Sequence, residues 1–118
     1  GHRDGERVVS KTDFQISNAF DRLVNMTAAE LRHWLATDES KKVGFTYPGE
    51  SESVGRQSAR RIITILDGGK VRGSVEATRK HKRKVVGYIK RHLAQRPSGD
   101  VSETRWRYSL MNWGHDPL

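Results

Sequence analysis

The chain of 118 residues contains no cysteine. Disulfide scaffolds and thiolate metal sites are therefore excluded, and an intracellular location is compatible with this absence. No apolar run approaches the roughly 18 residues that a membrane-spanning helix needs, and the first residues lack the apolar core of a signal peptide. We therefore expect no membrane association and an intracellular protein, cytoplasmic or in the nucleoid, or in the nucleus if the source is eukaryotic.

Apolar residues are also few, at 34% of the chain against 31% charged residues. This balance lies near that of disordered chains, but three Trp, three Tyr and three Phe supply large side chains for a core. Because lengths of about 100 to 150 residues are the commonest for single domains, we expect one helical domain over residues 13–118. Residues 1–12 are predicted to be a flexible N-terminus, and the initial Gly-His is interpreted as the remnant of a tag.

Acidic residues are absent between Glu76 and Asp100, and this gap holds the most basic part of the chain. The segment 79–96 alone contains eight Lys or Arg. Residues 1–55 carry 7 Lys and Arg against 9 Asp and Glu, whereas residues 56–118 carry 15 against 5, within a total net charge of +8. Such a surface is typically matched by phosphate, whose neutralisation releases counterions. The alternative is a basic face that is only solvated.

Apolar residues recur at helical spacing, and no segment alternates strictly as a strand would. Thr27 and Glu30 have the spacing of a capping box, which predicts a helix start, and Asp100 and Glu103 have the same spacing before the last helix. Residues 40–52 are rich in Lys, Gly, Pro, Ser and Glu, which predicts a loop. The predicted helices are 13–24, the segment after Thr27, 54–66, a helix that begins between 74 and 79 and ends before 97, and the segment after Asp100. The predicted fold class is all-α, a compact single domain of four to five helices.

The helix predicted before Pro97 has an apolar stripe and a cationic side. The stripe consists of Val85, Val86, Ile89 and Leu93. The cations that gather on the opposite side are Lys80, Arg83, Lys84, Lys90 and Arg91. Gly87 falls within the cationic arc and costs a helix interior about 1 kcal/mol relative to Ala. We therefore expect another backbone to approach it closely, either a phosphate strand or a neighbouring helix.

Two tryptophans near the end of the chain allow two interpretations. Trp106 and Trp113 are seven residues apart with Leu110 between them, which is the spacing of a core stripe. The alternative is that they are platforms for unstacked bases, since Arg105 and Arg107 flank Trp106. Large aromatic side chains are usually buried, so we favour the core.

No arrangement of residues indicates catalysis or metal binding. The histidines are scattered at His2, His33, His81, His92 and His115. Even the two on one predicted helix, His81 and His92, would lie roughly 16 Å apart, beyond the reach of one ion. Nucleophile elbows, Ser/His/Asp spacings and phosphate-binding glycine loops are absent. We therefore expect neither an enzyme nor a cofactor.

Three stretches of the chain together resemble one family of small proteins. They are VNMTAAELRHWLATDESKKVG, ESVGRQSARRIITIL and KVVGYIKRHLAQRPSGDVSETRWRYSLMNWGHDP. The family is the domain of unknown function numbered 3140, the resemblance covers about Val24 to Pro117, and the run RWRYSLMNWGHDP is its most specific part. Its members are mostly described as hypothetical or DNA-binding proteins, so the resemblance implies nucleic-acid binding and brings no catalytic motif. The segment RGSVEATRKHKRK is more basic than the mixed segment typical of relatives, so the basic patch would be partly peculiar to this chain.

The sequence thus predicts a small nucleic-acid-binding protein that contacts DNA, or secondarily RNA, through a basic helix. Many Lys and Arg without helix-turn-helix spacing indicate phosphate contacts and not sequence-specific readout. The alternative is a protein-interaction module without catalytic activity, in which a second copy of the chain or an acidic partner covers the basic helix. The candidate nucleic-acid-binding residues are Arg56, Arg60, Arg61, Arg79, Lys80, Lys82, Arg83, Lys84, Lys90, Arg91 and Arg96.

Overall fold

The computed structural model describes residues 11–118, and all regular secondary structure in that range is helical. The elements are α1 (Lys11–Leu23), α2 (Ala28–Leu35), α3 (Asp38–Lys41), α4 (Val54–Leu66), the 3₁₀-helix η1 (Val71–Gly73), α5 (Val75–Leu93) and α6 (Arg105–Asn112). The all-α prediction is confirmed. Within residues 11–118 there are six α-helices in place of the four to five expected, because the start of the predicted loop 40–52 belongs to the one-turn helix α3, which Thr37 caps.

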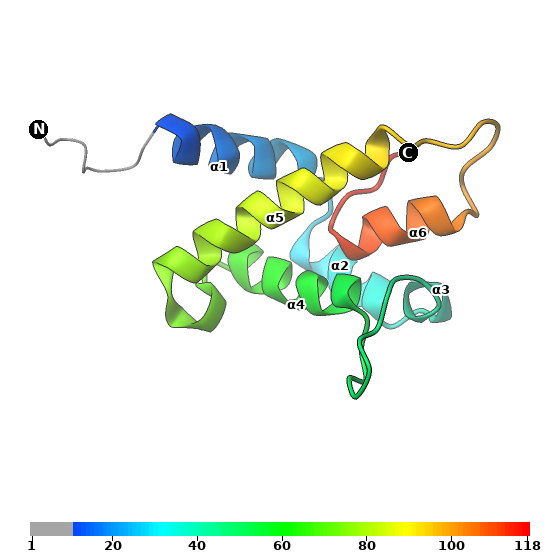
Figure 1. Ribbon diagram of the computed structural model, residues 1–118, viewed down its shortest axis with the longest axis horizontal. Coiled ribbons are helices and arrows are strands. Elements are labelled where there is room, and N and C mark those ends of the chain that lie inside the picture. Colours follow the sequence, from blue (N-terminus) through cyan, green and yellow to red (C-terminus); the bar gives the residue numbers. More distant parts are fainter. Residues whose placement is uncertain (1–10) are drawn as a thin grey trace, which may run out of the picture.

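α5 runs through the middle of the molecule, with α1 along one side and α4 and α6 on the other (Figure 1). Five of the helices each contribute at least one fully buried large side chain, among them Phe20 from α1, Leu31 from α2, Ile62 from α4, Ile89 from α5 and Leu110 from α6. These side chains belong to one cluster, so the described helices share a single core. Burying such side chains is the main stabilising contribution to a fold of this size.

Local sequence signals explain most helix boundaries. Thr27 and Glu30 form the predicted capping box: the Thr27 hydroxyl accepts from the Glu30 amide at 3.1 Å, and the Glu30 carboxylate accepts from the Thr27 amide at 2.8 Å. The predicted start of the last helix at Asp100 is wrong. Asp100 accepts from the Ser102 amide in a turn, and Thr104 caps α6 instead. Both carboxylate and hydroxyl side chains can cap, so sequence spacing alone did not distinguish a turn from a helix start.

The predicted flexible N-terminus overlaps α1, which already begins at Lys11, and residues 1–10 lie outside the described residues. Within residues 11–118, no helix combines the length and the apolarity needed to cross a bilayer.

Candidate nucleic-acid interface

The cationic helix α5 is fixed by its apolar stripe. Ser74 caps its first turn by accepting from the Ala77 amide. Val85, Val86 and Ile89 are buried as predicted, while Leu93 is half-buried. With this side held in the core, the cations of α5 other than Lys90 fall into two groups that have different surroundings.

The first group faces α1 and contributes to holding the two helices together. The carboxylate of Asp13 forms ion pairs with Arg79 at 3.4 Å and with Arg83 at 3.3 Å. The ammonium group of Lys82 lies 5.4 Å from the centre of the Phe20 ring and donates to Ser17. The charges of these cations are therefore partly matched within the protein. Lys90 is exposed and forms no ion pair with any described residue.

The second group consists of Lys80, Lys84 and Arg91. At about 100° per residue, the three positions lie within roughly 40° of one another around the helix. All three side chains are exposed, and none forms an ion pair with a residue in the described part of the chain. Together they form an uncompensated stripe of positive charge, which we call the Lys84 stripe.

Gly87 lies within the Lys84 stripe. The structural reason for a glycine at this position differs from the predicted one. A Cβ atom at Gly87 would lie 3.1 Å from Nη1 of Arg91, and no backbone of another element approaches it within 4 Å. The expected close approach of a neighbouring helix is therefore wrong for the described residues. The glycine instead leaves room for the Arg91 guanidinium to fold back along its own helix.

A basic cavity of about 370 Å³ adjoins the stripe. Its cationic lining comes from three elements: Arg61 from α4, Arg72 from η1, and Lys80 and Lys84 from α5. Neither Asp nor Glu lines it. Arg72 has positive φ (φ 52°, ψ 28°), a conformation that is uncommon for residues other than glycine and that often marks functional sites. Sequence reasoning missed Arg72, whose only signal was its place in the basic half of the chain.

His81 closes the floor of this cavity as a neutral group. It is buried, and its Nε2 lies 3.0 Å from the Ser58 hydroxyl. Burial lowers the pKa of His81 to about 4, and the positive charges of Arg61 and Lys84 act in the same direction, while an interaction with the Ser58 backbone opposes the shift. At neutral pH the cationic character of the cavity therefore comes from its Lys and Arg residues.

Arg56 is not a surface cation. It was predicted as a nucleic-acid-binding residue, but its side chain is buried. Its guanidinium donates to the Leu35 carbonyl at 2.7 Å and to the Ser40 hydroxyl at 2.8 Å, and it pairs with Glu52 at 3.2 Å. The end of α2 and the helix α3 supply these two acceptors. The Arg56 guanidinium therefore donates to protein groups and not to water.

Two further candidate nucleic-acid-binding residues, Arg60 and Arg96, interact with other side chains of the protein. Arg60 is exposed but forms a 2.6 Å ion pair with Glu52. This contact lowers the pKa of Glu52, first through the hydrogen bond from Arg60. Arg96 lies beyond the end of α5, with its guanidinium 5.3 Å from the centre of the Trp106 ring. Neither residue lines the basic cavity.

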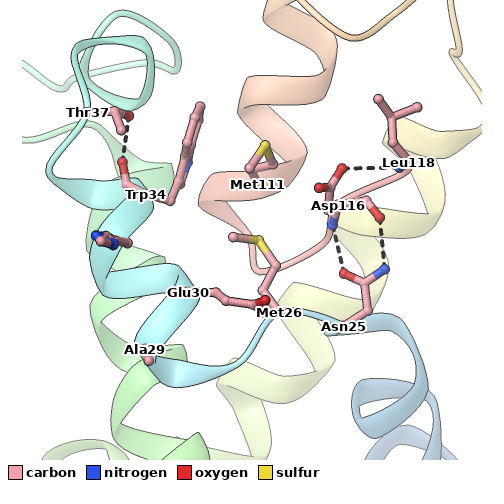
Figure 2. Close-up of a pocket in the computed structure, with 10 residues that line it drawn as sticks. Asn25, Met26, Ala29, Glu30, Trp34, Thr37, Met111, Asp116 and Leu118 are labelled. Carbon is pink, nitrogen blue, oxygen red and sulfur yellow. Dashed lines mark hydrogen bonds between the residues drawn. The ribbon is translucent and has the colours of Figure 1, made fainter.

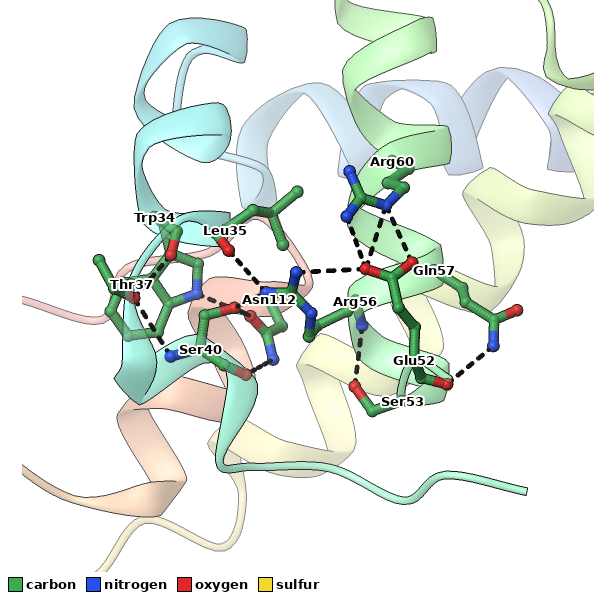
Figure 3. Close-up of polar contacts among 10 residues, drawn as sticks. All are labelled: Trp34, Leu35, Thr37, Ser40, Glu52, Ser53, Arg56, Gln57, Arg60 and Asn112. Carbon is green, nitrogen blue, oxygen red and sulfur yellow. Dashed lines mark hydrogen bonds and ion pairs between the residues drawn. The ribbon is translucent and has the colours of Figure 1, made fainter. Parts of the chain in front are cut away.

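The buried Asn112 extends the network around Arg56 and was missed by sequence reasoning. Its side-chain oxygen accepts from Trp34 Nε1 at 2.7 Å and from the Ser40 hydroxyl at 2.6 Å, and its amide donates to the Ser40 carbonyl (Figure 3). These bonds tie α2, α3 and α6 together. A buried amide of this kind needs such partners, because leaving its polar atoms unsatisfied costs about 1 to 3 kcal/mol.

The core interpretation of the C-terminal tryptophans is confirmed. Trp106 and Trp113 are buried, as is Leu110 between them. Trp106 Nε1 donates to the His92 carbonyl at 2.7 Å. Arg107 forms an ion pair with Asp116 at 3.0 Å, which raises the pKa of the guanidinium and lowers that of the carboxyl, chiefly through the hydrogen bonds between them.

A larger cavity, of about 680 Å³, lies on another face, between α2 and the C-terminal residues (Figure 2). Its charged lining is acidic, and both carboxylates serve the fold. Glu30 completes the capping box, and Asp116 accepts from Arg107 and from the Leu118 amide. No group of three or more His, Cys, Asp or Glu among residues 11–118 could hold a metal ion. This cavity is therefore suited neither to phosphate nor to a metal.

The fold and the site define a small all-helical protein whose long helix α5 carries a basic stripe that forms no ion pair with any described residue. The model of the family described as "Protein of unknown function (DUF3140)" matches residues 19–111, and the chain belongs to this family. The predicted resemblance is thereby confirmed. Neither a curated protein nor a solved structure matches the chain.

Proposed function

We propose that the protein binds nucleic acid through the Lys84 stripe and the adjoining basic cavity. The observation that carries the proposal is that Lys80, Lys84 and Arg91 are exposed without an ion pair to any described residue. The cavity brings Arg61 and Arg72 to the same face, and no carboxylate lines it. Like charges held this close repel one another, and a phosphate backbone relieves the repulsion while releasing counterions.

The proposed contacts are to phosphate and carry no sequence preference. Proteins read base edges with Arg or Lys on guanine and with Asn or Gln on adenine, whereas contacts to phosphate carry no sequence information. The cations of the stripe and cavity are mixed Lys and Arg with no such amide among them. DNA is the proposed ligand and RNA the second candidate, and an intracellular location remains part of the proposal.

The predicted binding set changes when the surroundings of each cation are considered. Lys80, Lys84, Lys90, Arg91 and Arg61 remain in it, and Arg72 is added. The residues whose charges are matched or directed elsewhere are Arg56, Arg60, Arg79, Lys82, Arg83 and Arg96. The proposal therefore rests on a smaller and more contiguous set than the sequence indicated.

The test is a titration of a short duplex at two salt concentrations with two matched variants. Lys80→Ala/Lys84→Ala removes two charges from the stripe, whereas Arg22→Ala/Arg105→Ala removes two exposed cations that lie in α1 and α6. Each phosphate contact adds about 0.9 to the slope of log affinity against log salt. Lys80→Ala/Lys84→Ala should bind the duplex more weakly, and the magnitude of its slope of log affinity against log salt should be smaller by about 2. Equal losses in both variants would contradict the proposal, since they would reflect net charge alone.

The alternative is association of two copies. Asp38 and Glu39 on α3 are exposed and form no ion pair with a described residue, so they could cover the stripe of a second copy. Light scattering as a function of salt distinguishes this candidate from the first: it requires a dimer that dissociates as salt rises and that the stripe variant cannot form.

A further inference from the structure

A second cavity lies next to the basic cavity. It has a volume of about 380 Å³ and lies between α5, α6 and the connection from α3 to α4, part of which projects from the body of the molecule (Figure 1). Lys84 lines both cavities, so the two are neighbours on one face. The aromatic residues that line the second cavity are Phe45, Tyr47, Tyr88 and Trp113.

Two of these rings are unusually exposed. Phe45 is 62% exposed and Tyr47 is 56% exposed, and their rings meet edge to face with centroids 4.8 Å apart. The backbone beneath them is anchored: the Phe45 carbonyl accepts from the Val54 amide at 2.8 Å, and the Tyr47 carbonyl accepts from Glu50 in a turn. The fold therefore holds two large rings in contact with solvent beside a cavity, where a bound ligand would bury them.

The other two aromatic residues that line the cavity form a stacked pair. Tyr88 and Trp113 lie parallel, with centroids 4.2 Å apart and planes inclined by 12°. Trp113 is buried and Tyr88 half-buried, so the core fixes this wall. Gly55 lies against it, because a Cβ atom there would come within 3.1 Å of Trp113 Nε1. The cavity is thus lined by one aromatic pair that is held in the core and by one that is exposed.

The charges around the cavity determine what kind of ligand fits. Lys84 and Arg91 are its charged lining residues, and neither Asp nor Glu lines it. Flat aromatic surfaces beside unpaired cations are what proteins use to bind single strands: the bases stack on the rings, and the cations follow the backbone. In a duplex the base faces are already stacked on one another, so they cannot enter such a site.

We propose that this cavity receives an unstacked base of a single-stranded nucleic acid, while Lys84 and Arg91 bind the flanking phosphates. The inference rests on the proposed nucleic-acid binding and makes it more specific, since it names the single strand as the preferred form. The basic cavity on the other side of Lys84 then takes the continuing backbone.

The experiment compares three probes at equal length: an oligothymidylate, an abasic strand with the same phosphates, and a duplex. The wild-type chain should bind the oligothymidylate about tenfold or more tightly than the abasic strand, because only the former offers bases for stacking. Phe45→Ala/Tyr47→Ala should abolish this difference and leave duplex affinity unchanged. Phe14→Ala, which truncates an equally exposed ring on α1, is the control and should leave both affinities unchanged.

The outcomes separate the two proposals. Equal wild-type affinity for the oligothymidylate and the abasic strand would overturn the base-binding inference and leave phosphate binding intact. Failure to bind any of the three probes at low salt would overturn both. Because Phe45 and Tyr47 are exposed, their truncation should not unfold the chain, and an unchanged melting temperature verifies this.

Discussion

Ser58 and His81 join α4 to α5 through a buried hydrogen bond, with His81 Nε2 3.0 Å from the Ser58 hydroxyl. Arg61 and Lys84 lie close enough to His81 to disfavour its protonation, in addition to the larger effect of burial. The basic cavity therefore has an imidazole in its floor that must stay neutral for the fold to be most stable.

The free energy of unfolding should consequently fall as the pH is lowered from about 6.5 to about 4. The pKa of His81 is about 4 in the folded chain against an ordinary 6.5, so between these values the unfolded chain binds more protons. The stabilising contribution is complete above about pH 6.5 and is lost toward pH 4, by up to about 3 kcal/mol. Urea unfolding of the parent and of His81→Gln at several pH values measures it. A variant with the same pH dependence as the parent would show that His81 is not the responsible group.

Arg56→Ala should destabilise the fold by about 3 kcal/mol, because it leaves the Leu35 carbonyl and the Ser40 hydroxyl without their buried donor. Arg60→Ala is the matched control, since Arg60 pairs with the same Glu52 from an exposed position and should cost less than about 1 kcal/mol. Denaturant midpoints compare the two. Equal costs would contradict the structural role assigned to Arg56.

Trp106→Ala should cost about 3 to 5 kcal/mol, as truncation of a buried aromatic side chain does. The loss includes the hydrogen bond from its indole to the His92 carbonyl. A variant that melts like the parent but loses affinity for single strands would instead identify the ring as a stacking platform.

Gly87→Ala should raise the free energy of unfolding by about 0.5 to 1 kcal/mol through helix propensity. The added Cβ atom meets only the end of the flexible Arg91 side chain, which can rotate away. Thermal melting measures the gain, and a lower melting temperature would show that the folded-back Arg91 conformation matters for stability.

Unrelated duplexes of equal length should compete with dissociation constants within about tenfold of one another, because phosphate contacts carry no base information. Specific binders prefer their site by roughly 10³-fold or more. Competition at physiological salt tests this directly. One duplex preferred a thousandfold would require base contacts, for which Gln57, Arg61 and Arg72 would be the first residues to examine.

The sequence by itself determined the helical class, the second helix start and the basic character of α5. These properties depend on residues within one or two helical turns of each other. Examples are the capping pair Thr27 and Glu30 and the apolar residues Val85 and Ile89 of α5. Capping and amphipathic spacing are local, so they can be read from adjacent positions. The misplaced start of α6 shows the limit of this local information, since Asp100 satisfies the same pattern within a turn.

Only the tertiary structure decided which cations are available to a ligand. Asp13 pairs with Arg83 from 70 positions away, and Arg56 bonds to Leu35 from 21 positions away. The same holds for the aromatic cavity, which Phe45 lines together with Tyr88 of α5 and with Trp113, just after the end of α6. The sequence shows that a residue is cationic or aromatic, but it does not show whether a distant segment of the chain covers that residue. Its availability depends on long-range packing, which here leaves Lys84 exposed between the basic cavity and the aromatic one.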